Sequence, residues 1–135
     1  MNVLVVVESE FLRASLCGVI AGMDGVQSVR CSRTLLDAFR KTAAAPPALI
    51  IVDFPLVDGN TRQAIDTFRK FAPDAAVAVC ADDVGNMIRE ACLQGGANYF
   101  CDKTRDVVEL LEIVQRAAQR FAGKTNFSTT AGTTP

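Results

Sequence analysis

Acidic and basic side chains stand directly behind apolar segments of this chain at three widely separated places. Glu8 follows the run NVLVVV, Asp53 ends the segment ALIIVD, and Lys103 follows ANYFCD. If these segments are parallel strands, their carboxyl ends meet at one edge of the sheet, where open α/β sheets bind ligands. Two carboxylates and an ammonium suffice for phosphoryl transfer to a carboxylate, because Mg²⁺ and lysine can neutralise the developing charge. The spacing favours Asp53 as a nucleophile, with a helix-capping role as the alternative.

Five apolar segments alternate with five segments of helical periodicity, and these elements must position the three side chains. NVLVVV and ALIIVD are continuously apolar, as strands buried on both faces are. VQSVRC, from Val26, is less apolar, which predicts a strand nearer the edge of the sheet. Ser9 is placed to cap the first helix, whose apolar positions include Phe11, Leu12, Leu16, Val19 and Ile20. With right-handed crossovers, the alternation predicts an α/β fold with a doubly wound, five-stranded parallel sheet.

The chain has 135 residues and a net charge of −1, which fits one soluble globular domain. We expect the domain to span residues 1–122. Residues 123–135, GKTNFSTTAGTTP, are small and polar without periodicity, which predicts a disordered tail or a linker stub. The balanced charge argues against direct nucleic-acid binding, and the longest apolar run is too short to span a bilayer.

The five cysteines are odd in number and widely spread, at positions 17, 31, 80, 92 and 101. They form no CxxC pair, and the chain contains no histidine, the usual partner of cysteine at zinc sites. We therefore expect five free thiols, packed as small hydrophobic residues in a protein of the reducing cytoplasm.

These segments resemble the receiver domain of two-component response regulators over roughly residues 2–121. The matching pieces are the first strand ending in an acid before EFLRASL, LIIVD followed by a proline and DG, VAVCA, and GGANYFCDK before a final amphipathic helix. EFLRASL and DKT are similar to the NarL-type branch, whose receivers usually precede a helix-turn-helix output domain. The resemblance implies a flavodoxin-like (βα)5 receiver fold.

The resemblance also implies a role for each matching position. Asp53 would accept a phosphoryl group, and Lys103 would pair with the phosphoryl oxygens. Glu8, Asp53 and the backbone carbonyl of Pro55 would hold Mg²⁺. The implied partner is a sensor histidine kinase or a phosphotransfer protein, and a homodimer is an arrangement that the sequence leaves open. The domain would not be an enzyme, beyond self-catalysed phosphotransfer and dephosphorylation.

The sequence departs from the family pattern at the metal and switch positions. Val7 replaces the first of two acids that usually end the first strand. Cys80 stands where a switch hydroxyl is usual, and Phe100 at the switch aromatic. The loop DFPLVDG is two residues shorter than is typical. Two interpretations follow: a phosphoacceptor with altered metal dependence, which we favour, or a pseudo-receiver that acts as a phosphorylation-independent interaction module. An aspartyl phosphatase is disfavoured, because Pro55 stands where its second aspartate would be.

Overall fold

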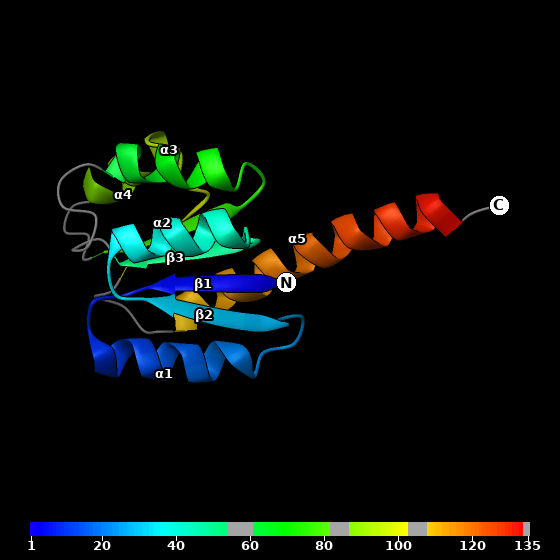
Figure 1. Cartoon of the computed structure of the whole chain (residues 1–135), viewed down its shortest axis with the longest axis horizontal. Helices are drawn as coiled ribbons and strands as arrows, with labels where there is room; N and C mark the ends of the chain where they lie inside the picture. The colour runs from blue at the N-terminus through cyan, green and yellow to red at the C-terminus, as the bar shows by residue number, and fades with distance from the viewer. Residues whose placement is uncertain (54–60, 82–86, 103–107, 134–135) are drawn as a thin grey trace.

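A computed structural model of the chain describes residues 1–53, 61–81, 87–102 and 108–133, with backbone alone for residue 61 and residues 124–133. Strands and helices alternate along the whole chain, as the periodicity predicts (Figure 1). Their order is β1 (Asn2–Val6), α1 (Glu10–Ala21), β2 (Ser28–Ser32), α2 (Leu35–Ala44), β3 (Leu49–Asp53), α3 (Thr61–Phe71), β4 (Ala76–Ala81), α4 (Met87–Gln94), β5 (Tyr99–Asp102) and α5 (Val108–Thr133).

The five strands form one parallel sheet in the order β2-β1-β3-β4-β5. The less apolar strand β2 lies at an edge, which confirms the sequence-based expectation. The chain winds from β1 to β2 on one side and continues from β3 on the other side of β1. The strand order therefore reverses between β1 and β3, and ligands of doubly wound sheets bind in the crevice at such a switch point.

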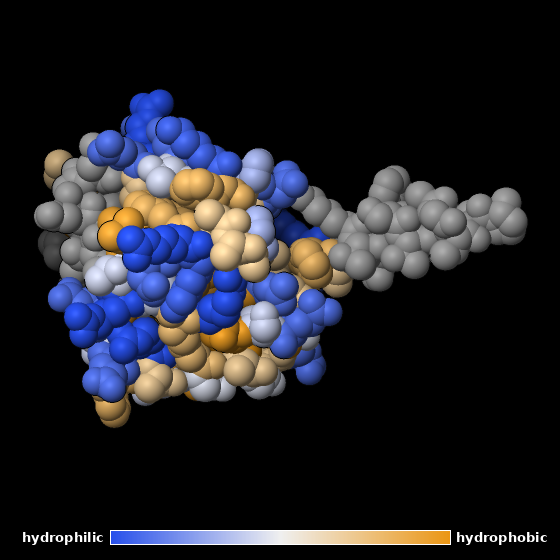
Figure 2. Space-filling model, viewed as in Figure 1, coloured by the Kyte–Doolittle hydropathy of each residue, from blue (hydrophilic) through white to orange (hydrophobic). Residues whose placement is uncertain are grey.

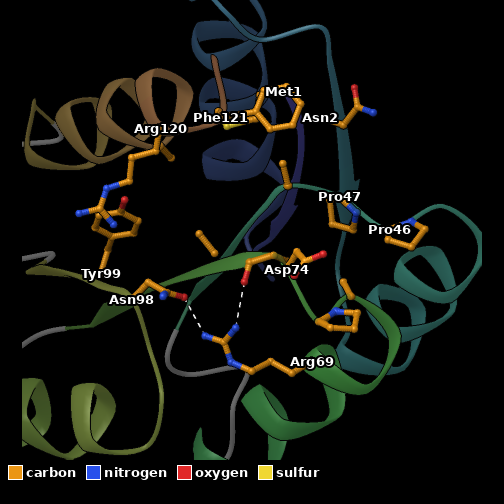
Figure 3. A pocket seen from close by; sticks show the side chains of 16 residues that line it. Met1, Asn2, Pro46, Pro47, Arg69, Asp74, Asn98, Tyr99, Arg120 and Phe121 are labelled. Atoms are coloured by element: carbon orange, nitrogen blue, oxygen red, sulfur yellow. Dashed lines mark hydrogen bonds between the residues drawn. The ribbon is translucent and has the colours of Figure 1, made fainter. Parts of the chain in front are cut away.

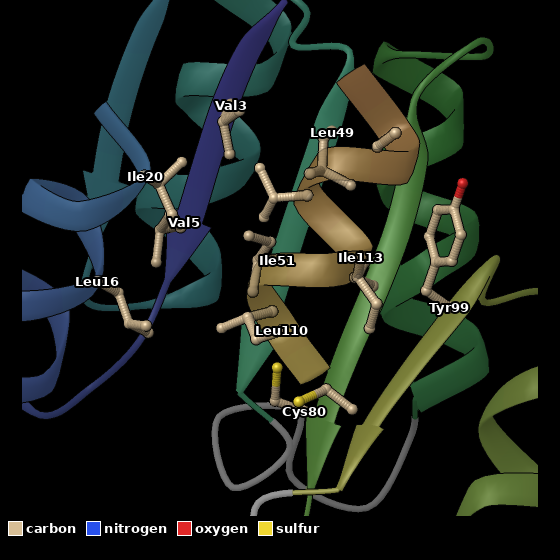
Figure 4. Packing of buried hydrophobic residues seen from close by; sticks show 14 of the residues in the cluster. Val3, Val5, Leu16, Ile20, Leu49, Ile51, Cys80, Tyr99, Leu110 and Ile113 are labelled. Carbon is tan, nitrogen blue, oxygen red and sulfur yellow. The ribbon is translucent and has the colours of Figure 1, made fainter. Parts of the chain in front are cut away.

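Helices cover both faces of the sheet, which is why β1 and β3 are apolar at every position except Asn2 at the start of β1 and Asp53 at the end of β3. α1 and α5 cover one face, and α2, α3 and α4 cover the other (Figure 1). Alternate residues of each strand enter the two layers, so that Val3, Val5 and Val7 face α1 and α5. Figure 4 shows this layer, in which Leu110 and Ile113 of α5 pack over Ile51.

α1 begins as predicted but buries a narrower face than its periodicity suggests. The Ser9 hydroxyl caps the helix by accepting a hydrogen bond from the backbone N–H of Leu12. Leu16 and Ile20 are buried, whereas Phe11 is 83% and Val19 is 52% exposed. Figure 2 shows tan and white side chains at the lower edge of the molecule, where α1 lies, next to blue ones. A helix at the margin of a sheet contacts the core along one line of side chains only, so part of its apolar face stays in solvent.

The prediction of five free thiols is wrong for two of the cysteines. Cys17 of α1 and Cys31 of β2 form a disulfide, whereas Cys80, Cys92 and Cys101 are buried thiols. The pairing depends on α1 packing beside the edge strand, so that residues 14 positions apart in the sequence meet in space. Sequence spacing alone does not report this contact, because no short cysteine motif accompanies it.

The last helix continues beyond residue 122, where the sequence predicted the end of the domain and a disordered tail. The backbone of α5 is helical to Thr133, and Figure 1 shows its last turns projecting away from the sheet. Once a helix is nucleated, each added residue gains a hydrogen bond, and composition alone does not show where that propagation stops. None of the described helices is both long and apolar enough to cross a membrane.

Candidate functional site

Asp53 is the last residue of β3 and lies at the switch point of the sheet. The strand before it, LIIV, is fully buried, and Asp53 itself is only 7% exposed. A carboxylate is costly to bury in an apolar setting unless other groups compensate for the lost water. Its position at the carboxyl end of a central strand favours a chemical role over a capping role.

Glu8 lies just beyond the end of the neighbouring strand. Val6 pairs with Val52 in the register of β1 and β3, so the next residues, Val7 and Asp53, leave adjacent strands at the same level. The Val7 side chain is buried in the layer beneath α1 and α5. Glu8 follows it, just beyond the end of β1, and is exposed. The structure thus brings the two predicted acids to one end of the central strands.

Cys80 is the register partner of Asp53 on the other side. β3 and β4 pair Asp53 with Cys80, and Cys80 is 6% exposed. Ile51 and Cys80 both enter the layer of α1 and α5, and Asp53, two residues after Ile51, points to the same face of the sheet. The predicted switch position is therefore next to the predicted acceptor, with a thiol in place of a hydroxyl.

Phe100 lies one strand further along and on the opposite face. Phe100, in β5, pairs with Val79 of β4 and packs into the layer of α2, α3 and α4, where it is 4% exposed. The guanidinium carbon of Arg89, on α4, is 5.5 Å from the centre of its ring, which is within the range of a cation–π contact. Phe100 is therefore positioned to contact α4 and does not line the edge occupied by Asp53.

Two predicted site residues, Pro55 and Lys103, lie outside the described residues. Within the described ranges, no cluster of three or more histidine, cysteine or acidic side chains could hold a metal ion. Glu8 and Asp53 nevertheless fit Mg²⁺ in chemistry, because this ion prefers oxygen ligands and is commonly held by one or two carboxylates together with water. The donor set is thus compatible with Mg²⁺ but sparse.

Arg13 is a residue near the site that the sequence reasoning missed. It lies on α1, and its Nη1 donates hydrogen bonds to the backbone carbonyls of Val7, at 2.9 Å, and Glu8, at 3.3 Å. Helical side chains lean toward the N-terminus, so an arginine at the fourth position of a helix can reach the preceding segment, but the sequence does not show which backbone atoms it contacts.

A separate cavity of about 920 Å³ lies at the opposite edge of the sheet, where the strands begin (Figure 3). Arg69 of α3 crosses this edge and donates to the carbonyls of Ala75 and Gly96 and to the side-chain oxygen of Asn98. These hydrogen bonds join α3, β4 and the turn before β5. The cavity is therefore at the far end of the strands from Asp53 and plays no part in the candidate site.

Comparisons with known proteins agree with this geometry. No protein-family model and no curated protein matches the chain. Among solved structures, the chain is similar to the response regulator domain of Thermotoga maritima CheB, with a TM-score of 0.74 and 26% identity over 88% of this chain and 96% of that one. It is also similar to a LuxR-family two-component response regulator from Aurantimonas sp. SI85-9A1, with a TM-score of 0.76 and 17% identity over 87% and 84%.

A LuxR-family DNA-binding response regulator from Silicibacter pomeroyi matches with a TM-score of 0.71 and 24% identity over 88% of this chain and 92% of that one. The matches therefore include LuxR-family regulators, which correspond to the NarL-type branch that the motifs EFLRASL and DKT resemble. These neighbours agree with the strand order and with the acid at the end of β3 in indicating one fold. The chain has the fold of the response-regulator receiver domains.

Proposed function

We propose that the domain accepts a phosphoryl group on Asp53 and that the modified domain controls an interaction with another protein. The observation that carries the proposal is the position of Asp53: a buried carboxylate at the switch point of a doubly wound sheet, beside the strand that leads to Glu8. The donor would be a phosphohistidine on a sensor histidine kinase or a phosphotransfer protein, the partner class that the receiver fold implies.

In the proposed reaction, a carboxylate oxygen of Asp53 attacks phosphorus in line with the leaving group. The new P–O bond forms as the P–N bond to the donor imidazole breaks, and the imidazole leaves with the bonding pair. Asp53 then carries an acyl phosphate. The transition state gathers negative charge, which Lys103 would offset through its ammonium group. Bound Mg²⁺, held by Glu8, Asp53 and the Pro55 carbonyl, would supply further positive charge.

The test is incubation of the protein with Mg²⁺ and acetyl phosphate, followed by intact-mass measurement. We expect one phosphoryl adduct, absent in Asp53→Asn and retained in Asp66→Asn, which changes an exposed aspartate of α3. Chelation of Mg²⁺ before the donor is added should prevent the adduct. An adduct that persists in Asp53→Asn would contradict the assignment of the acceptor.

The second candidate is a pseudo-receiver that acts as an interaction module without phosphorylation. Two observations favour it: the buried side chain of Val7 replaces a carboxylate, and the Cys80 thiol, a weak donor, is the register partner of Asp53. The same experiment separates the two functions, because a pseudo-receiver would show no adduct with Mg²⁺ or Mn²⁺ at any concentration of acetyl phosphate.

A further inference from the structure

Arg13 joins the first helix to the backbone segment that carries Glu8. Its Nη1 donates to the Val7 carbonyl at 2.9 Å and to the Glu8 carbonyl at 3.3 Å. The backbone N–H of Arg13 also donates to the Ser9 carbonyl at 2.8 Å. Three consecutive carbonyls, those of Val7, Glu8 and Ser9, therefore accept hydrogen bonds from this one residue.

The position of these carbonyls gives the contact its significance. Val7 N–H donates to the Ser32 carbonyl of β2, so the backbone of Val7 is tied to the edge strand on one side. On its other side, Val7 lies at the same level as Asp53, because the pairing of β1 with β3 ends one residue earlier, at Val6 and Val52. Neighbouring strands of a sheet are about 4.8 Å apart. Arg13 fixes the chain from this point onward, where the ladder between β1 and β3 has ended.

The site depends on this segment because Glu8 is the acid that directly follows the buried run of β1 and Val7, and Glu10, the competing carboxylate, is already in the first turn of α1. Where two carboxylates are available, the displacement of one leaves the other to hold a cation. Here Val7 is buried and apolar, so the direction of the Glu8 side chain depends on how the main chain at Val7 and Glu8 is held. A ligand set works only when its supporting contacts fix its geometry.

We propose that Arg13 is a positioning residue for the cation-binding side of the candidate site: it holds the main chain of Val7 and Glu8 so that the Glu8 carboxylate is presented beside Asp53. The inference rests on the proposed function and adds to it a residue that contacts neither phosphate nor metal. The guanidinium is suited to this role because its charge strengthens both hydrogen bonds to the carbonyls.

The first test needs no phosphorylation. Amide hydrogen exchange is measured on metal-free wild-type protein, on Arg13→Gln and on Arg116→Gln, which changes an exposed arginine of α5. We expect Arg13→Gln to raise the exchange rates of the Val7 and Leu12 amides, which donate to the Ser32 carbonyl and the Ser9 hydroxyl, about tenfold or more, and Arg116→Gln to leave them unchanged. Equal rates at these amides in wild type and Arg13→Gln would overturn the inference. If Arg13→Gln does not fold, Arg13→Met, which also lacks the charged donor, replaces it in the same comparison.

The second test separates positioning from general stability. The initial rate of phosphorylation by acetyl phosphate is measured against Mg²⁺ concentration. Loss of a residue that orients a metal ligand typically weakens metal affinity 10- to 100-fold, so we expect the half-saturating Mg²⁺ concentration to rise by about tenfold in Arg13→Gln. The rate at saturating Mg²⁺ should change little, and Arg13→Lys should recover part of the affinity.

The outcomes distinguish this inference from the proposed function. A phosphorylated wild type with the same Mg²⁺ dependence as Arg13→Gln overturns the positioning role and leaves the phosphoacceptor standing. A wild type that takes no phosphoryl group overturns the phosphoacceptor, and hydrogen exchange then decides whether Arg13 orders the Val7–Glu8 segment.

Discussion

At the scale of residues, the acceptor and its switch partner are close together but chemically mismatched. Asp53, the last residue of β3, pairs in register with Cys80, the last but one of β4, and both face the same layer of helices. A phosphoryl oxygen on Asp53 would need a donor from this position, and a thiol donates weakly. The weak donor should reduce the shift from the unmodified to the switched state on phosphorylation, because a ligand shifts an equilibrium only by its differential affinity for the two states.

Replacement of Cys80 by threonine should therefore strengthen the response to a phosphoryl group. A hydrogen bond to a charged acceptor contributes about 1.5–3 kcal/mol. We expect beryllofluoride, which mimics the phosphoryl group on an aspartate, to raise the melting temperature more in Cys80→Thr than in wild type. Cys101→Thr is the matched control, because Cys101 pairs with Cys80 and is buried in the same layer. Equal shifts in wild type and Cys80→Thr would argue against a missing hydrogen bond.

Individual site residues were predictable where a strand ends. Asp53 and Cys80 could be placed from sequence because a continuous apolar run identifies a buried strand and thus shows where that strand ends. Arg13 could not, because its contacts depend on the rotation of α1 over the sheet and on the path of the chain between Val7 and Ser9. Local periodicity predicts that a helix forms but not which backbone atoms its long side chains reach.

At the scale of elements, α1 is attached to the sheet by three kinds of contact. Leu16 and Ile20 pack in the core, Arg13 holds the segment before the helix, and a disulfide joins Cys17 to Cys31. The order of the elements was predictable from the alternation of periods, but the pairing of α1 with β2 was not. Packing between elements is a tertiary property, and it accounts for both the disulfide and the exposed side chain of Phe11.

The disulfide should stabilise the fold and should be detectable by thiol counting. Iodoacetamide under denaturing, non-reducing conditions should label three cysteines, and all five after reduction. For a loop of this length, loss of the cross-link should lower the free energy of unfolding by about 3 kcal/mol. We expect Cys17→Ser/Cys31→Ser to show that loss in urea unfolding.

Reductant provides the control for this experiment. It should destabilise the wild-type protein by a similar amount and leave the double variant unchanged. Labelling of five cysteines without prior reduction would show that Cys17 and Cys31 are thiols in the isolated protein.

At the scale of the whole molecule, the compact body and the end of α5 are separate features. The last described buried residues of α5 are Ala117 and Ala118, and Phe121 is partly exposed. The helix then continues to Thr133 beyond the end of the sheet (Figure 1). The boundary at residue 122 stays a prediction, and the backbone is helical on both sides of it.

Truncation should separate the two parts. We expect the truncation after Gly123 to change the free energy of unfolding by less than about 1 kcal/mol. A protein ending at Gly123 should therefore melt within about 2 °C of the full chain, since a change of 1 kcal/mol shifts the melting temperature by at least about that much. A protein ending at Arg116 lacks Ala117 and Ala118 from the core and should melt many degrees lower. A large loss of stability in the first truncation would show that residues 124–135 contribute to the folded body.

The hydrogen bonds of Arg69 have a consequence for motion. They connect the end of α3, the start of β4 and the turn between α4 and β5 at the edge where the strands begin. Asp53 lies at the other edge, at the carboxyl ends of the strands. The hydrogen bond from Arg69 to the Gly96 carbonyl holds the chain just after the C-terminal end of α4, so α4 cannot slide along its axis. We therefore expect a structural change at the Asp53 edge to tilt α4 about its C-terminal end. Small displacements beside Asp53 would then become a change of tilt, largest at the N-terminal end of α4.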